Sequence, residues 1–538
     1  HSVYITVFGE TGKREDIGPD MTSLPVLKVS GRSGQSLVWG GDSQTLSWTH
    51  GSTLYKQDLA EAFAFLNESL KTPDENDFYE PVSQGIELGF TAKLDKPSNY
   101  KALVGGRIVT MRDADKQQEV IEDGVVLING NRIEAVGKRK DIDLPKGTIK
   151  MNVEGKTLIP GLIDVHAHGP QGREDIIPQQ NWRNLSSLAF GVTTIHDPSN
   201  KTTEIFAASE LQKTGKVIGP RLFSTGAIIY GAKNPSLRAI IHSLDDAKFY
   251  LQRLKDVGAV SIKSYVQPRR DQRQQLLAAA RESDMMVVVE GAARFNENIN
   301  MIVDGHTGLE HALPIAKGYD DVKQLWQASK VGYTPTFSVA YGGLWGEEYW
   351  YDRTNVWENP RLLRYTPSYL VEARSIRRPT APDNQYNHMA VAAFAKQLRD
   401  LGVRVQIGGH GQREGLAAHW EIWSMVQGGF SPWEALRGAT IDGAIHLGMN
   451  NDIGSIEAGK LADIVVIDGD PLSDIRRSEY VTYTMLNGRL FEAKTMNELG
   501  EKSTPRKPLF FERLNITSMP EETSNAITDK GLRYHWVH

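Results

Sequence analysis

The apolar residues near the N-terminus fall into short runs. Residues 3–7 alternate between apolar and polar positions, and glycine-rich turns then separate runs at 37–39, 45–48 and 53–55. Short alternating runs bounded by turn residues predict β-strands. We therefore expect a small β-sheet within residues 1–60. Residues 61–99 are polar and without a clear period, so we expect a linker there.

Two further segments show the strand pattern, and they lie far apart in the chain. The first has apolar runs at residues 102–104, 107–111, 124–128 and 132–136, and the second has them at 463–467 and 481–486. Asn129, Gly130 and Asn131 form a typical hairpin turn in the first segment. Neither segment has enough strands to bury a sheet face alone. We therefore predict a composite β-sandwich of residues 100–158 and 452–495, followed by a tail over 496–538.

Between these segments, over residues 159–451, short apolar runs alternate with stretches of helix length. The runs lie at residues 162–165, 193–195, 261–263, 286–289, 308–311, 333–336 and 403–407. Such alternation and a length of roughly 250 residues or more are typical of a (β/α)8 TIM barrel. The fold class we predict is α/β, with catalytic residues where the barrel strands end.

Composition excludes several classes of protein. The 538 residues are 40% hydrophobic and 24% charged, as in ordinary globular proteins. A net charge of -5 and the lack of a long Lys/Arg run argue against nucleic acid as a partner. No apolar stretch approaches the ~20 residues of a membrane span. The chain has no cysteine, so a metal ion would need histidine, carboxylate or modified lysine ligands.

The most informative stretch is TLIPGLIDVHAHG at residues 157–169. Alternation along a strand directs His166 and His168 to the same side at its C-terminal end, where two imidazoles can share one cation. A His-x-His pair alone is also found in purely structural roles. The preceding Pro-Gly-Leu-Ile-Asp makes the pattern far more specific.

This stretch strongly resembles the amidohydrolase superfamily, whose chains pass from a β-sandwich into the barrel through hPGhIDxHxH. They return through GxIxxGxxADhhhh, which residues 453–463 match here. ATIDGAIHLGM at 439–449 is similar to the helix that precedes this return, and its His446 is expected to pack within the helix layer. The resemblance covers residues 100–490 and implies a metal-dependent hydrolase with one or two ions. Zinc is expected, with manganese or iron(II) as alternatives.

The resemblance also implies individual ligands. Lys263 in VSIKSYV matches the position of a carboxylated lysine that bridges two metals in many members, although a simple ion pair is the alternative. A desolvated neutral lysine is nucleophilic toward carbon dioxide, and the carbamate is an anionic oxygen ligand. His311 in GLEHALP matches the histidine of the sixth strand. His306, five residues earlier, is expected to lie in a turn or behind the ligands.

Two positions depart from the common pattern of the family. Glu290 stands where most members have a histidine after the fifth strand, and His410 stands where they have an aspartate after the eighth. Glutamate is a competent metal ligand, and histidine accepts a proton near neutral pH. We therefore expect His410 or Glu290 to move protons. The segments at 196–200 and 267–275 resemble a branch of imidazolonepropionase- and prolidase-like members fused to a β-propeller.

Further candidates could bind substrate. His196 ends the second strand and could reach the site, although a hydrogen-bonded structural role is the common alternative. Arg269 and Arg270 have planar donors that suit a substrate carboxylate, but paired surface arginines are usually only solvated. The aromatic insertion at residues 341–369 is either a lid over the barrel or an oligomer contact.

The sequence GGDSQTLSWTHGSTLYKQDL at residues 40–59 resembles one blade of a Tol-type β-propeller. One blade cannot close a ring of four to eight, so the resemblance implies that the remaining blades lie upstream of His1. The chain starts at His1 and not at Met, which also leads us to expect a longer polypeptide. The alternative is a small β appendage. The propeller resemblance favours a periplasmic or secreted protein, with a cytoplasmic one as the alternative.

Taken with the resemblance, these residues predict hydrolysis of a C–N amide-type bond in a small molecule by a metal-activated water. A dipeptide or an N-acylated amino acid is the favoured substrate, while cyclic amides, lactones and deaminations stay open because the superfamily performs them all on one scaffold. We expect a homo-oligomer. The alternative function is a non-catalytic binding or scaffold protein with a degenerate barrel site.

Overall fold

The computed structural model describes residues 2–10, 12, 14–19, 21–64, 80–112, 119–231, 239–267, 269–315, 317–500 and 503–513. The chain forms two compact units. The first consists of His1–Lys93, Ile229–Ala259 and Gln267–Asp284, and the second of Leu94–Ile228, Val260–Val266 and Met285–His538. None of the helices within the described ranges is long and apolar enough to cross a membrane.

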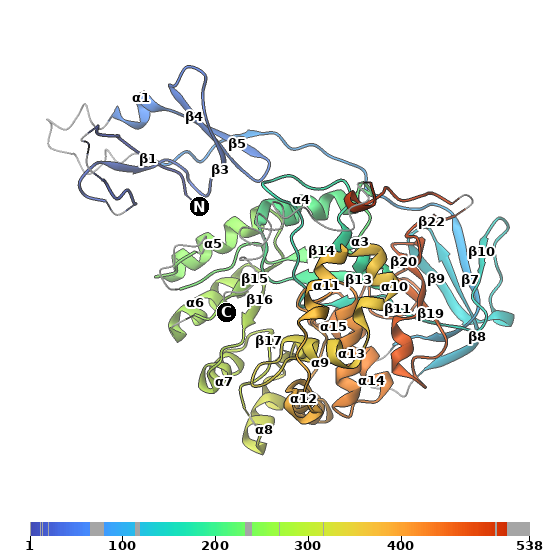
Figure 1. Cartoon of the computed structure of the whole chain (residues 1–538). Coiled ribbons are helices and arrows are strands. Elements are labelled where there is room, and N and C mark those ends of the chain that lie inside the picture. Colours follow the sequence, from blue (N-terminus) through green and yellow to red (C-terminus); the bar gives the residue numbers. More distant parts are fainter. Residues whose placement is uncertain are drawn as a thin grey trace. The chain divides into compact units, whose positions relative to one another are not determined.

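The first unit contains a four-stranded antiparallel sheet in the order β3-β4-β5-β6 (Figure 1). Its strands are β3 (Gln35–Trp39), β4 (Thr45–His50), β5 (Thr53–Asp58) and β6 (Ile86–Glu87). Alternate residues of β4 are buried, and Leu46 and Trp48 belong to the core of this unit. The unit also contains β1 (Tyr4–Thr6), β2 (Val26–Lys28), α1 (Leu59–Ala62), α5 (Leu244–Asp256) and α6 (Arg270–Glu282).

The boundaries of this unit differ from the predicted ones. The segment expected to be a linker, 61–99, contributes β6 to the sheet, while residues 65–79 of it lie outside the described residues. The helices α5 and α6, expected in the barrel, group with the N-terminal segment. The physical reason is a set of contacts to α5: Arg32 pairs with Asp256, and Lys28 Nζ lies 5.0 Å from the centre of the Phe249 ring.

A four-stranded antiparallel sheet is the form that one blade of a β-propeller takes. The strands β3, β4 and β5 include the 40–59 segment on which that resemblance rests. One such sheet is equally the form of a small β appendage. The propeller and any blades upstream of His1 therefore stay predictions.

The second unit contains a nine-stranded sheet built from both flanking segments. Its order is β22-β21-β20-β19-β11-β7-β8-β9, and β10 pairs with β7. The strands are β7 (Tyr100–Val109), β8 (Val120–Asn129), β9 (Arg132–Lys138), β10 (Ile149–Asn152), β11 (Lys156–Pro160), β19 (Ile464–Asp468), β20 (Val481–Leu486), β21 (Arg489–Glu492) and β22 (Glu498–Leu499).

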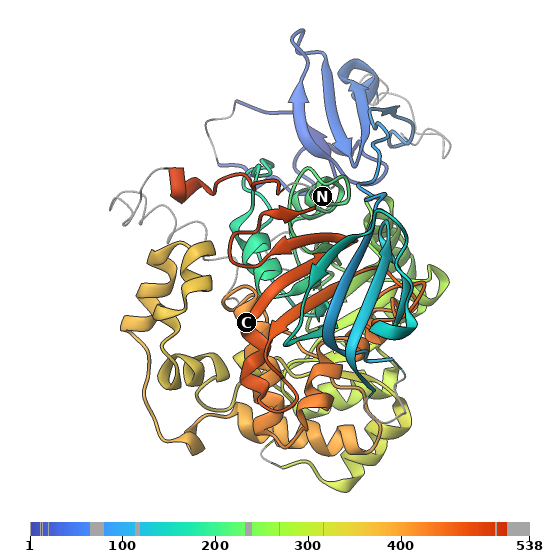
Figure 2. The same cartoon turned by 90° about the vertical axis from the view of Figure 1, so that its right-hand side faces the viewer.

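The two flanks meet where β11 runs antiparallel to β19, with Lys156 opposite Asp468 and Pro160 opposite Ile464. Figure 2 shows the cyan strands of the first flank beside the orange and red strands of the second. Leu158, Ile464 and Val466 are fully buried in the core of this sheet. The strand β22 extends the sheet into the segment expected to be a tail.

The parallel strands of the second unit form two further sheets, ordered β12-β13-β14 and β15-β16-β17-β18 (Figure 1). They are β12 (Leu162–Asp164), β13 (Val192–Asp197), β14 (Arg221–Ser224), β15 (Ser261–Ser264), β16 (Met286–Glu290), β17 (Gly308–Glu310) and β18 (Gly332–Thr334). These strands are short and almost wholly buried, as in sheets covered on both faces.

An eighth parallel segment, residues 403–407, connects these two sheets. Val405 forms a parallel bridge with Tyr333, and the Tyr333 amide donates to the Arg404 carbonyl at 2.9 Å. On its other side, the Val165 amide donates to the Ile407 carbonyl at 3.2 Å. Eight parallel segments thus follow one another in the order expected of a barrel. Because β14 and β15 belong to separate sheets, closure of the barrel stays a prediction.

Helices follow the parallel strands along the chain. In the second unit they are α3 (Trp182–Ala189), α4 (Thr202–Lys213), α7 (Phe295–Asp304), α8 (Asp320–Ser329), α9 (Gly346–Arg353), α10 (Pro360–Tyr365), α11 (Ser368–Ile376), α12 (His388–Asp400), α13 (Leu416–Gln427), α14 (Pro432–Gly438), α15 (Ile441–His446) and α16 (Phe510–Arg513). Short 3-10 helices are η1 (Arg139–Asp141), η2 (Phe337–Val339), η3 (Val356–Glu358), η4 (Asp383–Gln385) and η5 (Ile475–Glu479).

The aromatic insertion at residues 341–369 is mainly helical. It contains α9, η3 and α10 and continues into α11. Trp350 and Tyr351 are almost fully buried and belong to the main core of the unit. Its aromatic side chains therefore contribute to the packing of this unit, and a lid or an oligomer contact stays a prediction.

Candidate metal centre

The two histidines of the HxH pair follow directly on β12. His166 is completely buried, and its Nε2 lies 3.2 Å from Nε2 of His168. The two imidazoles therefore present the same ring nitrogen to one another. This is the arrangement in which both could share one cation.

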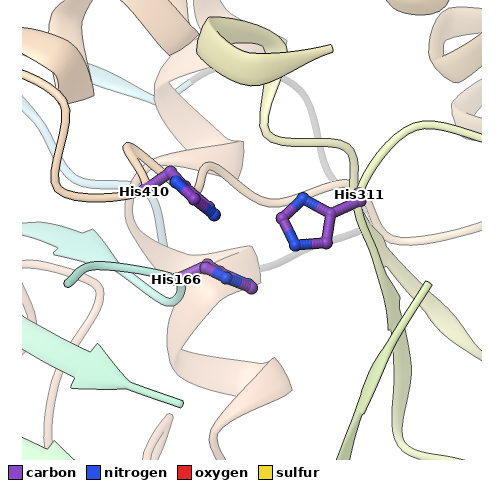
Figure 3. Close-up of side chains that lie close together, drawn as sticks. All are labelled: His166, His311 and His410. Atoms are coloured by element: carbon purple, nitrogen blue, oxygen red, sulfur yellow. The ribbon is translucent and has the colours of Figure 1, made fainter. Parts of the chain in front are cut away.

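His311 and His410 join His166 from other strand ends. His311 follows β17, and His410 follows the 403–407 segment. His166, His311 and His410 are buried, and one ring nitrogen from each lies within 4.8 Å of the others. In Figure 3 the rings of His166 and His410 extend side by side toward His311, which comes from the opposite side. The centre of the His168 ring lies 4.8 Å from that of His410, so four imidazoles gather here.

Three of these rings are held through Nδ1 by a side-chain oxygen. Glu310 Oε2 lies 2.5 Å from His166 Nδ1, and Asp197 Oδ1 lies 3.0 Å from His168 Nδ1. Thr336 Oγ1 lies 2.8 Å from Nδ1 of His311. Partners of this kind fix the orientation of metal-binding histidines and are nearly as important as the ligands.

Glu290 connects Lys263 with His311. It ends β16, its Oε1 lies 2.8 Å from His311 Nε2, and its other oxygen contacts Nζ of Lys263. Burial raises the pKa of the Glu290 carboxyl, but the charges of Lys263 and His311 outweigh this and hold that pKa well below its usual value. Glu290 is therefore ionised near neutral pH.

Lys263 lies on β15 and is almost fully buried, as the ligand assignment requires. Its contact with Glu290 is the ion pair that was the alternative role for this residue. An ammonium group has no lone pair for a metal. Lys263 therefore fits a metal only in its neutral or carboxylated form, and its carboxylation stays a prediction.

Asp164, at the end of β12, connects this strand with the residues that follow the 403–407 segment. Its Oδ1 accepts from the amides of His166, at 3.2 Å, and Gly409, at 3.0 Å. The His410 amide also donates to the His166 carbonyl at 2.7 Å. Gly408 permits this close approach, since a Cβ there would lie 2.7 Å from Cβ of His166. These contacts set His410 beside His166.

The electrostatic environment keeps His166 neutral. Burial, together with the nearby Lys263 and His311, lowers the pKa of His166 well below its usual value. A neutral imidazole retains the lone pair that a metal ligand needs. Burial raises the pKa of its partner Glu310 to about 8 and that of Asp164 to about 6.

His196 has a different environment from the one expected of a substrate ligand. It is buried, its Nε2 lies 2.8 Å from Ser261 Oγ, and its Nδ1 lies 3.3 Å from the Val165 carbonyl. Burial lowers its pKa to about 4. Both ring nitrogens thus have partners outside the histidine group, which is the structural role that was the alternative for this residue.

Other predicted residues lie outside the histidine group. His306 Nδ1 lies 2.9 Å from the Met301 carbonyl, and His446 is buried in α15. Arg269 and Arg270 belong to the first unit, where Arg269 Nη2 pairs with Asp271 Oδ2 at 3.1 Å. Their role as substrate ligands stays a prediction.

Sequence reasoning missed Asp197, Glu310, Thr336 and Arg183. Asp197 and Glu310 have a visible signal, because each directly adjoins a histidine at a strand end. Arg183 lies on α3 and lines a cavity of about 30 Å³ that His168 and Asp197 also line. A cavity of this size holds a water molecule. Nothing in the local sequence marks Arg183 or Thr336 as part of a site.

The sequence is similar to known proteins over most of its length. The model of the amidohydrolase family matches residues 157–491, which is more than half of the chain. An imidazolonepropionase from Alkaliphilus metalliredigens is 22% identical over 412 residues, covering 70% of this chain and 92% of that protein. A 5-methylthioadenosine/S-adenosylhomocysteine deaminase from Clostridium tetani is 22% identical over 432 residues, covering 72% and 92%.

Solved structures show the same fold. A Xaa-Pro dipeptidase with bound methionine in its active site superposes with a TM-score of 0.56 at 20% identity. The superposition covers 73% of this chain and the whole of that one. At this level of identity the likeness concerns the fold.

Proposed function

Because this chain belongs to the amidohydrolase family, we propose that it is a metal-dependent hydrolase that cleaves a C–N bond of the amide type. The observation that carries this proposal is the convergence of His166, His311 and His410, with His168 alongside, after the carboxyl ends of parallel strands. Active sites of barrel enzymes lie at this end of the strands.

The donor set fits a divalent cation. His166, His168 and His311 would hold it, with Lys263 added in its carboxylated form, because catalytic zinc sites use three protein ligands and keep one position open. Each of the three histidines has an oxygen partner on Nδ1, which orients it for binding through Nε2. In His311 this nitrogen also faces Glu290 Oε1 at 2.8 Å, so a bound cation would take the place of that contact. When bound, such a cation lowers the pKa of a water molecule and polarises the scissile carbonyl. Zinc fits, as do manganese and iron(II).

The chain's own residues would move the protons. We assign the acceptor role to a ring nitrogen of His410, because this residue stands at the family's aspartate position and its ring lies 5.2 Å from that of His166. Glu290 is the second candidate, as an ionised carboxylate beside His311. Asp197 and Glu310 hold His168 and His166 in place.

For the substrate we propose a dipeptide or an N-acylated amino acid. The likeness to a solved Xaa-Pro dipeptidase supports this class, and the exposed Arg269 offers a partner for a substrate carboxylate. Cyclic amides, lactones and deaminations are the competing classes, and the likeness to an imidazolonepropionase and to a deaminase keeps them open. Arg270 and His196 complete the proposed substrate contacts, with His196 the weakest because both its nitrogens are engaged.

The test combines elemental analysis of the purified protein with a screen of dipeptides, N-acylated amino acids and cyclic amides. We expect one or two equivalents of a transition metal and turnover of at least one dipeptide or N-acyl compound. A protein that contains no stoichiometric metal, and that stays inert after zinc or manganese is added, would instead be the non-catalytic binding or scaffold protein. A periplasmic or secreted location and a homo-oligomeric state stay predictions.

A further inference from the structure

The turn after β18 has an unusual backbone. Thr336 has a φ of 48°, in the left-handed region, which β-branched residues rarely adopt. The short helix η2 begins at the next residue, Phe337. A conformation of this kind persists only when the surrounding structure holds it. Something must therefore fix this turn.

The same turn orients a proposed metal ligand. Thr336 Oγ1 lies 2.8 Å from Nδ1 of His311, and the opposite nitrogen of that ring, Nε2, lies 2.8 Å from Glu290 Oε1. The Thr336 hydroxyl and Glu290 therefore fix the orientation of the ring together, one from each side. A shift of the turn would rotate the ring away from His166 and His410.

The residue that fixes the turn is Glu421, which lies on α13. Its Oε2 accepts from the amide of Phe337 at 3.0 Å. Its Oε1 accepts from the amide of Ser338 at 2.7 Å and from the Ser338 hydroxyl at 2.8 Å. Both oxygens of one carboxyl group are thus used on two adjacent residues of a single turn.

The burial of Glu421 makes this arrangement informative. Glu421 is 0% exposed, and burial raises its pKa to about 8, because the hydrogen bonds from Ser338 and Phe337 offset the effect of burial only in part. A carboxyl group buried in this way is costly, whether ionised or neutral, unless hydrogen bonds compensate it. Among the ion pairs between described residues, none involves Glu421. Its compensation therefore comes from the 337–338 turn, and a residue that served only to pack α13 could be apolar at no such cost.

We propose that Glu421 is a positioning residue that acts through the 336–338 turn to direct Nε2 of His311 toward the metal. This inference rests on the proposed function of the histidine group. The relay is Glu421 to Phe337 and Ser338, then Thr336 to His311. Glu421 itself touches neither metal nor substrate.

The test measures zinc affinity by competition with a chromophoric chelator. We expect Glu421→Gln to lower zinc affinity about 10- to 100-fold, the usual loss when a partner of a metal ligand is removed. The single amide oxygen of glutamine cannot accept in place of both oxygens of the Glu421 carboxyl group. Glu434→Gln is the matched control, because Glu434 also accepts from a backbone amide, that of Ser431, but at the start of α14. Its zinc affinity should equal that of the wild type.

Two variants of Thr336 test the middle of the relay and cover the case in which Glu421→Gln fails to fold. Thr336→Val removes the hydroxyl and should lower zinc affinity as Glu421→Gln does, while Thr336→Ser keeps the hydroxyl and should retain it. The double variant Glu421→Gln/Thr336→Val should bind no more weakly than Thr336→Val alone, since residues in one relay are not additive. Unchanged affinity in the folded single variants, or additive losses in the double, would overturn the proposal.

A crystal structure of Glu421→Gln separates this inference from the proposed function. We expect a shifted 336–338 turn and a rotated His311 ring. An unmoved ring would overturn the positioning role whether or not zinc binds. If the wild type does not bind zinc but the His311 ring is rotated in the variant, the proposed function is wrong and the positioning role of Glu421 still holds.

Discussion

At the scale of single residues, the proposed role of His410 can be tested most directly. It has a left-handed backbone, with φ of 56°, and its amide donates to the His166 carbonyl at 2.7 Å. This bond holds it next to the HxH pair. A proton acceptor and a fourth metal ligand would both lie this close to His166. The two roles of His410 can therefore be separated only by measurements on a variant.

We predict that His410→Ala lowers turnover by about 100- to 10,000-fold with metal content unchanged, the usual effect of losing a general base. Metal content and turnover are measured on the same sample. His388→Asn is the control, because His388 is buried in α12, where its Nε2 lies 2.9 Å from Gln427 Oε1. Loss of metal along with turnover would make His410 a ligand, and unchanged turnover would refute both roles.

The HxH pair gives a second prediction at this scale. His166→Ala and His168→Ala should each empty at least one metal site, while the far-ultraviolet circular dichroism stays that of the folded protein. The reason is that residues at the carboxyl end of barrel strands serve the site more than stability. Full metal content in both variants would refute the assignment.

His419 predicts a dependence of stability on pH. It lies on α13, its Nε2 is 2.9 Å from the Phe190 carbonyl, and burial lowers its pKa from 6.5 to about 3. Below pH 6.5 the unfolded chain takes up a proton that the folded protein does not. The free energy of unfolding should therefore fall by up to ~1.4 kcal/mol per pH unit from this residue, an effect absent above pH 6.5.

The measurement for His419 is urea unfolding of the wild type and His419→Gln between pH 7 and 4. The variant is expected to start less stable but to lose stability less steeply as the pH falls. Parallel pH profiles for the two proteins would show that His419 does not titrate on unfolding.

The candidate site residues that gather here were more predictable than the residues that orient them. His166, His168, His311, Glu290 and His410 stand at strand ends, where the pattern alone places chemistry. Thr336 and Glu421 act through a turn whose geometry follows from long-range packing, so no local signal marks them. Glu421 lies on α13, whose sequence resembles that of an ordinary buried helix.

At the scale of elements, alternation along the chain predicted most parallel strands but not their exact form. Residues 403–407 make the bonds of a strand on both sides without a regular ladder, because they bridge two separate sheets. The aromatic insertion is helical, since its tryptophan and tyrosine side chains pack into the core. The form of both segments depends on contacts with neighbouring segments in the folded protein, which the local sequence does not show.

The step from β11 into β12 depends on a small residue. Gly161 lies between these strands, and a Cβ there would lie 2.1 Å from Thr193 Oγ1 and 2.6 Å from Thr193 Cγ2. Thr193 is itself buried and cannot move away freely. We predict that Gly161→Ala destabilises the second unit by ~1–3 kcal/mol, the usual cost of overpacking.

Thermal unfolding checks this prediction, with Gly137→Ala as the control. Gly137 lies in β9, and its nearest neighbour would be the mobile end of Ile142, at 3.2 Å. The control should lie within ~0.5 kcal/mol of the wild type. Equal stability of both variants would show that β12 adjusts to the added methyl group.

At the scale of the whole molecule, membership of the amidohydrolase family confirms the resemblance seen in the sequence. The comparisons do not show a fused propeller. The grouping of α5 and α6 with the N-terminal sheet could not be predicted, because it depends on contacts such as Arg32 with Asp256, which are 224 residues apart. The spacing of residues along the sequence does not indicate that Arg32 and Asp256 form a pair.

Metal removal gives a prediction at this scale. A ligand bound only by the folded state stabilises it by ~2.7 kcal/mol at 100 times its dissociation constant. Chelation should therefore lower the melting temperature of the second unit, and added zinc should restore it. Calorimetry of wild type and His166→Ala distinguishes this from an effect of the chelator itself, because the variant, with at least one metal site already empty, should show a smaller decrease.

The antiparallel pairing of β11 with β19 has a consequence for how the protein is made. Lys156 and Asp468 are 312 residues apart, and a ribosome adding about 5–20 residues per second needs roughly 15 to 60 seconds between them. Throughout that time β11 has only β7 as a neighbour, paired at Thr157 and Leu158. The edge of β11 that later pairs with β19 therefore stays unpaired in the nascent chain while the residues of the candidate site are being synthesised. Premature termination before residue 464 would leave that edge open to proteases and to other nascent chains.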